Sequence, residues 1–186
     1  VPYRGAALAQ GPASRLPDGV LLATAAPWHA DPTGSTDSTA ALQAAFNAGA
    51  KSRRTVLIPK GRYMVTDTLN CSIDWPFMTE EGTDPGPPTP DWLFSAHVIV
   101  GEQRATSTGT AGSGAHDGEL SRRPTSLFVP SNTPGFTSKE HSKYVVHFYH
   151  TGVNGRFSQP DININQVLQG IDIEIGNGNI GAVGIM

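Results

Sequence analysis

Short apolar runs separated by glycine and proline fill most of the chain, and one segment has the spacing of a helix. In residues 38–50, Leu42 and Phe46 stand four positions apart and share one face of an amphipathic helix. Asp37 precedes this segment and is suited to the N-cap, because its carboxylate can accept hydrogen bonds from free backbone N–H groups. Gly49 is expected to mark the C-terminal end of the helix.

The apolar runs predict short β-strands, because each is only a few residues long and ends at a proline, a glycine or a polar turn. The run at residues 171–175 alternates strictly: its isoleucines face one way, and Asp172 and Glu174 face the other. The sequence therefore predicts an all-β protein with one helix. Its strands are expected near residues 20–22, 55–59, 62–65, 67–69, 97–101, 126–130, 144–150, 171–175 and 180–185.

Two long polar segments interrupt this pattern. Residues 74–92 are rich in proline and acidic side chains, and residues 105–124 are rich in glycine, serine and threonine. Neither composition can build a core, so we predict two long loops. Residues 1–30 show no clear period and are interpreted as an irregular lead-in to one β region, which spans residues 31–186.

Composition narrows the functional classes. The chain has 186 residues, a net charge of −3 and only 16% charged residues. This balance excludes a generally basic nucleic-acid binder, which needs clustered cations to contact phosphates. No apolar run approaches the ~18 residues that a membrane-spanning helix needs, so no membrane partner is predicted. We interpret the single cysteine, Cys71, as a small core residue; pairing with a segment outside this chain is the alternative.

Four segments of the chain are similar to the motifs of one known superfamily. Residues 31–43 (DPTGSTDSTAALQ) are similar to its first turn-and-helix motif, and residues 56–63 (VLIPKGRY) to the strand pair that follows. Residues 97–102 (HVIVGE) and 181–185 (GAVGI) resemble later rungs of that superfamily, the last as in its bacterial and fungal members. Together these segments resemble the pectate-lyase-like superfamily, in particular a β-1,3-glucanase-like N-terminal region. The resemblance implies a right-handed parallel β-helix with an N-terminal capping α-helix. Because the superfamily includes polysaccharide lyases, glycoside hydrolases, epimerases and phage tailspikes, this fold leaves the reaction open.

The length of the chain bears on how much of such a solenoid it holds. A rung takes about 20–30 residues, so the chain without its two loops supplies about three or four rungs. Enzymes with this fold are usually much longer, and we therefore expect an incomplete portion of a longer β-helix. An uncovered last rung would expose strand edges and apolar side chains, so the remainder of the β-helix is expected to pack on the C-terminal rung.

The alternating strand offers the first candidate site. Asp172 and Glu174 are two positions apart on one face, which places their Cα atoms about 7 Å apart. Paired carboxylates at such a spacing suit glycoside cleavage, in which one group protonates the leaving oxygen and the other acts as base or nucleophile. The resemblance implies the same role, since the superfamily commonly carries its acid–base groups on an outward face. The alternative is the polar face of a half-buried strand.

The first long loop offers a second candidate. Trp75, Trp92 and Asp91 are interpreted as substrate-binding residues, because aromatic rings stack on sugar faces and carboxylates bind sugar hydroxyls. The alternative is a loop that its tryptophans pack down onto the body of the protein. The histidines show no ligand spacing, so neither a metal site nor a cofactor is predicted.

Taken with the resemblance, these features predict a secreted enzyme that degrades polysaccharides. A glycoside hydrolase acting on a glucan-type polymer is the first hypothesis, because of the first motif and the long loops. A lyase acting on uronic-acid polymers is the alternative; it would commonly need a calcium site or a cation near the abstracted proton. A non-catalytic or tailspike-like glycan-binding β-helix is the hypothesis from another class.

Overall fold

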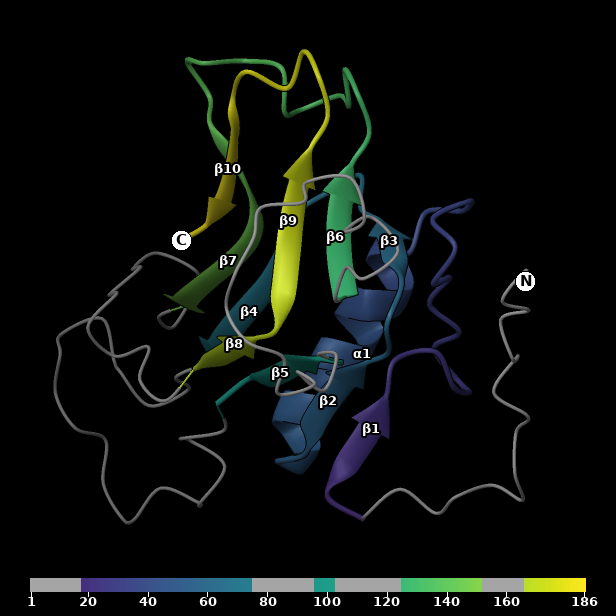
Figure 1. Cartoon of the computed structure of the whole chain (residues 1–186). Helices are drawn as coiled ribbons and strands as arrows, with labels where there is room; N and C mark the ends of the chain where they lie inside the picture. Colours follow the sequence, from purple (N-terminus) through teal and green to yellow (C-terminus); the bar gives the residue numbers. More distant parts are fainter. Residues whose placement is uncertain (1–17, 75–95, 103–124, 152–165) are drawn as a thin grey trace, which may run out of the picture.

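The computed structural model describes residues 18–74, 96–102, 125–151 and 166–186. These residues form one α-helix and short β-strands that lie side by side in stacked layers (Figure 1). In chain order the elements are β1 (Val20–Leu22), α1 (Thr39–Ser52), β2 (Thr55–Ile58), β3 (Arg62–Met64), β4 (Leu69–Asp74), β5 (Val98–Gly101), β6 (Thr125–Val129), β7 (Lys143–Thr151), β8 (Val167–Gln169), β9 (Ile171–Ile175) and β10 (Ala182–Ile185).

The strands form three sheets in which all neighbours are parallel. Sheet A has the order β1-β2-β5-β8, sheet B the order β3-β6-β9, and sheet C the order β4-β7-β10. The registers are regular: Tyr63 pairs with Leu127, and Leu127 pairs with Ile173. Parallel neighbours must be joined by crossover connections, so strands that are adjacent in a sheet are far apart in the chain.

One order of strands repeats along the chain. The strands β2-β3-β4, then β5-β6-β7, then β8-β9-β10 each supply one member to sheets A, B and C in turn. We call these sets the first, second and third triplets. Among the described residues, the predicted all-β class with one helix is confirmed, and each strand predicted there is present, with ends that differ by up to five residues.

The core lies between the three sheets. The inward positions of the first triplet are closed to solvent, among them Ile58 on β2, Tyr63 on β3, and Leu69 and Cys71 on β4. The interpretation of Cys71 as a core residue is confirmed, and burial raises the pKa of its thiol to about 12. Alternation along each strand therefore decides which side chains fill the interior.

Helix α1 packs against the first triplet. Leu42, Ala45 and Phe46, on the inward face of the helix, are fully buried. The side-chain amide of Gln43 donates from Nε2 to Asn70 O at 2.8 Å and accepts from Asn70 N at 2.7 Å. These are backbone groups of β4 that have no strand on that side, so the helix satisfies an edge that would otherwise need water or another strand.

The ends of α1 differ from the predicted ones. The N-cap residue is Ser38, not Asp37, and the Ser38 side chain makes no capping bond. The Asp37 carboxylate still accepts from Thr39 N at 2.9 Å, because it lies one residue before the cap and turns back to the first turn. The helix also runs past Gly49 to a left-handed C-cap at Arg53. Gly49 is inside the helix, where a Cβ atom would collide with Val56 Cγ2.

Two groups of hydrogen bonds act on Asp37. Burial alone would raise the pKa of its carboxyl. Hydrogen bonds from Thr39 and from Thr66 Oγ1, the latter at 2.6 Å, have the larger combined effect, so the pKa lies below its usual value. Thr66 follows β3, so this carboxylate joins the start of the helix to the first triplet. The predicted importance of Asp37 for the helix start is therefore right, although its position is not the cap itself.

The third triplet is far less covered than the first. Its exposed apolar side chains include Ile185 at 51% and Ile175 at 40%, and Ile180 and Met186, which flank β10, are 60% and 58% exposed. Within the described ranges, no helix is long and apolar enough to span a membrane. The predicted loops at residues 74–92 and 105–124, apart from Asp74 on β4, and most of the lead-in at residues 1–30 lie outside the described residues.

Candidate functional site on the outer face of sheet B

The outer face of sheet B is defined by the alternation of its strands. Tyr63 and Leu127 are fully buried and point inward, so the residues on either side of each point outward. In register, these outward residues form two rows across β3, β6 and β9. The rows are Arg62, Ser126 and Asp172, and Met64, Phe128 and Glu174.

Three outward side chains, one from each strand, contact one another. The Arg62 guanidinium carbon lies 3.4 Å from the centroid of the Phe128 ring. Arg62 Nε also donates to Glu174 Oε2 at 3.0 Å. The arginine therefore crosses the sheet diagonally, and the ring and the carboxylate fix its orientation. We call this group the Arg62 clamp.

The turn before α1, at residues 31–36, packs against this outer face. Gly34 has a φ of +69°, and a Cβ atom there would lie 2.7 Å from Arg62 O and 3.0 Å from Phe128 Cε1. Only glycine fits both the left-handed backbone and the close approach. Together, Arg62 and this turn leave Phe128 only 8% exposed, although it points outward.

Asp31 holds that turn in shape. Its carboxylate accepts from the hydroxyl and the backbone N–H of Thr33, at 2.7 and 2.8 Å, and also from both groups of Thr36 and the N–H of Ser35. These hydrogen bonds hold the pKa of the Asp31 carboxyl well below its usual range, and those from Thr33 have the largest effect. The acidic residue that opens the first motif therefore acts on the structure of the turn.

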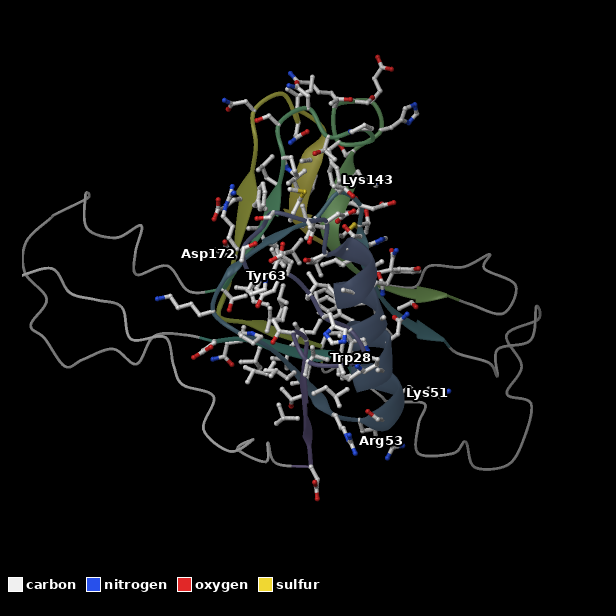
Figure 2. All side chains as sticks on the ribbon, turned by 90° about the vertical axis from the view of Figure 1, so that its right-hand side faces the viewer. Trp28, Lys51, Arg53, Tyr63, Lys143 and Asp172 are labelled. Atoms are coloured by element: carbon white, nitrogen blue, oxygen red, sulfur yellow. The ribbon has the colours of Figure 1, made fainter. Side chains whose placement is uncertain are left out.

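The two predicted catalytic carboxylates lie on this face in different surroundings. Asp172 is exposed and points away from α1 (Figure 2). The Glu174 side chain is 23% exposed and is held by Arg62. Their positions at alternate residues of β9 put both on the same side of the sheet, as the sequence predicts. The hydrogen bond from Arg62 Nε to Glu174 Oε2 fixes the position of this carboxylate, whereas the exposed Asp172 has no such partner among the described residues of the outer face.

The predicted loop residues cannot be compared with this face. Trp75, Trp92 and Asp91 all lie outside the described residues, so their role in substrate binding stays a prediction. Among the residues that the structure describes, no group of three or more histidine, cysteine, aspartate or glutamate side chains could hold a metal ion.

The outer face of sheet C carries a different arrangement. On β7 the ring of His147 lies 4.8 Å from that of Tyr144 and 4.6 Å from that of Tyr149, measured between centroids. Val145 and Val146 are both fully buried, so burial does not alternate strictly along this part of β7, and the three rings lie in one row. Burial lowers the pKa of His147.

Sequence reasoning missed the Arg62 clamp. Arg62 and Phe128 were expected only as members of strands, and Glu174 is 112 residues from Arg62 along the chain. One available signal was Phe128 itself, because a large aromatic ring at an outward position of a strand needs a cover.

Fold and site together define a parallel all-β protein with paired carboxylates on an outer sheet face. The family model described as rhamnogalacturonase A/epimerase, pectate lyase-like, matches residues 27–181. The chain therefore belongs to this pectate lyase-like family, and the predicted superfamily is confirmed. Such families are generally enzymatic on polysaccharides, which indicates a polysaccharide-active enzyme. Comparisons with curated proteins and with solved structures found no significant match.

Proposed function

We propose that the protein is a secreted enzyme that degrades polysaccharides, and specifically a glycoside hydrolase that acts on a glucan-type polymer. Asp172 and Glu174 are its proposed catalytic pair. The observation that carries this proposal is their common position on the outer face of β9, in a chain of the pectate lyase-like family. With Cα atoms about 7 Å apart on one face, their side chains can bring the two carboxyls within the range of separations that glycosidases use.

The surroundings of the pair support a division of roles. Glu174 is paired with Arg62 at 3.0 Å, and this charge-assisted hydrogen bond orients its carboxylate for the role of base or nucleophile. Asp172 is exposed at the other end of the pair and would meet the sugar first. Asp172 is therefore the proposed proton donor.

The local charge supports a neutral polymer. Among the charged residues of the two outward rows, Asp172 and Glu174 carry negative charge, and Arg62 is the positive one. The Arg62 charge is matched by Glu174 at 3.0 Å. A negatively charged polymer would therefore be repelled by the charge of Asp172, which no cation of these rows balances. A neutral glucan would not be repelled in this way.

A second candidate is cleavage of uronic-acid polymers, by hydrolysis or by elimination. The family description names rhamnogalacturonase A, and the Arg62 side chain is 50% exposed beside the carboxylates. A polymer that displaced Glu174 from Arg62 would find there a cation for its own carboxylate.

The repeated order of the three sheets supports a right-handed parallel β-helix in which each triplet is one turn. Crossover connections between parallel strands of one sheet are right-handed in about 98% of cases. Helix α1 would cap the first turn, since it buries Phe46 and bonds the edge of β4 through Gln43. The exposed apolar side chains of the third triplet support a further part of the β-helix, in this chain or another, as its cover.

The test is a cleavage assay on a panel of neutral glucans, pectins and alginates. New reducing ends detect cleavage, and the ultraviolet absorbance of unsaturated uronates marks elimination. On the polymer that the wild type cleaves, Asp172→Asn and Glu174→Gln should each lower the rate by about 10²–10⁴-fold. Glu140→Gln, at an exposed position on a turn, is the matched control and should leave the rate unchanged.

The outcomes separate the hypotheses. Reducing ends from glucans without ultraviolet absorbance support the proposed hydrolase, whereas cleavage of pectin or alginate alone supports the second candidate. Unchanged turnover in both carboxylate variants would reject the proposed pair. A trimer in light scattering that binds glycans and cleaves none would favour a tailspike-like binding protein instead.

A further inference from the structure

One short motif has no part in the proposed reaction. Asn70, Cys71 and Ser72 form an Asn-x-Ser sequence, and no other asparagine of the chain is followed two residues later by serine or threonine. This is the acceptor sequence for N-linked glycans, which are attached to asparagine side chains at the surface of secreted proteins. Whether the motif has a function depends on where β4 places the asparagine.

The alternation of β4 points Asn70 outward. Leu69 and Cys71, on either side of it, are fully buried, and Asn70 itself is partly exposed. The Asn70 side-chain nitrogen contacts only Thr68 O within the described residues, at 3.4 Å, which is long for a hydrogen bond. The amide that would carry a sugar is therefore outside the core and is not held in a strong network.

The backbone of Asn70 is fixed independently of its side chain. Gln43 of α1 bonds both its N–H and its C=O, and Asn70 is in register with His147 on β7. A substituent on the side chain would therefore leave the strand pairing intact. It would also emerge beside the ring row of Tyr144, His147 and Tyr149, whose rings offer an apolar surface next to polar edges.

We propose that Asn70 is an N-glycosylation site on the outer face of sheet C. The Asn70 amide nitrogen would form a bond to the anomeric carbon of an oligosaccharide carried on a polyprenyl diphosphate. The bond from that carbon to the diphosphate oxygen breaks, the lipid diphosphate leaves, and the amide gives up one proton. This proposal rests on the proposed secretion, through a eukaryotic secretory pathway, and it is independent of the proposed hydrolysis.

The experiment expresses the whole chain behind a secretory signal in a eukaryotic host, with a second acceptor sequence appended as a reporter of entry into the lumen. Intact mass and peptide mapping, before and after enzymatic release of the glycan, give the occupancy of Asn70. Wild type, Ser72→Thr and the control Asn177→Gln, at an exposed asparagine far from β4 in the sequence, should all carry a glycan at Asn70. Asn70→Gln and Ser72→Ala should lose it, and the serine variant keeps Asn70 itself for folding.

Two results would overturn the proposal. In the first, the reporter is glycosylated while Asn70 is bare in both wild type and Ser72→Thr. In the second, Ser72→Ala keeps the glycan at the mapped position of the wild type. A glycosylated chain that cleaves no polysaccharide would count against the proposed function alone, and an active chain with bare Asn70 would count against this site alone.

Discussion

The two ends of the stack of triplets are built from similar strands but differ in cover. At the first triplet, helix α1 lies over the sheets and buries Leu42 and Phe46 completely. At the third triplet, Ile175 on β9 is 40% exposed and Ile185 on β10 is 51% exposed. Alternation in the sequence thus predicts which way a side chain points, whereas the neighbouring layer decides whether it is buried.

The difference also bears on the candidate site. The proposed catalytic carboxylates are on β9, a strand of the less covered triplet, while Arg62, which holds Glu174, comes from the covered one. The Arg62 clamp therefore ties the strand that carries the candidate site to the better packed end of the structure. Variants that weaken the two ends separately show how far each supports the fold.

The largest expected effect is at the helix. Phe46→Ala should lower the free energy of unfolding by about 3–5 kcal/mol, because it leaves a cavity under α1. Ile185→Ala, at the other end, should cost less than about 1 kcal/mol, because half of that side chain already meets water. Urea unfolding measures both. Equal losses would show that the two ends contribute alike.

A smaller loss is expected where glycine allows close packing. Gly49→Ala should destabilise the fold by about 1–3 kcal/mol, since its new Cβ atom meets the branched Val56 side chain and neither can move freely. Gly184→Ala on β10 is the matched control, because the nearest atom to a Cβ there is Ile173 Cδ1 at 3.8 Å. A change near zero is expected for it in the same unfolding experiment, and a Gly49→Ala protein as stable as wild type would refute close packing of α1 on β2.

Next in size is the bond between α1 and the edge of β4. Gln43→Ala removes both hydrogen bonds to Asn70 and should cost about 1 kcal/mol, since water can partly replace them at this half-buried site. Hydrogen exchange of the Asn70 amide is the sharper measurement and should become faster. Gln43→Glu keeps an acceptor for the Asn70 amide, so this amide should exchange more slowly in Gln43→Glu than in Gln43→Ala. Equal exchange rates of the Asn70 amide in the two variants would contradict the role of Gln43.

The smallest effect is expected at Asp31, and it depends on pH. The folded pKa of Asp31 lies below its unfolded value of about 3.9. Its stabilising contribution is therefore present above pH 4 or so and is lost as the pH falls towards the folded pKa. Asp31→Asn should be less stable than wild type at neutral pH, and this difference should shrink below pH 4. A pH-independent difference in urea midpoints would contradict this account.

Much of this architecture could be predicted from local patterns. The spacing of Leu42 and Phe46 predicts the buried face of α1, and strict alternation predicts the outward position of Asp172 and Glu174. The end of α1 was predicted too early, because Gly49 was interpreted as a stop signal when its smallness serves contact with Val56. That contact joins two elements, and a local pattern does not contain it.

The Arg62 clamp could not be predicted for a related reason. It needs the register of three strands from three triplets, which brings Arg62, Phe128 and Glu174 together across 112 residues of chain. Each of these residues taken alone fits an ordinary strand. Only the stacking order of the sheets turns them into one group, and that order follows from packing over the whole chain.

The most direct test of the proposed site is the rate of polysaccharide cleavage by Asp172→Asn, measured with its urea midpoint. The account predicts a rate at least about 10²-fold below that of the wild type, because one member of the acid–base pair is lost, while the midpoint stays the same, because Asp172 is exposed. Cleavage at the wild-type rate by a folded Asp172→Asn protein would contradict it.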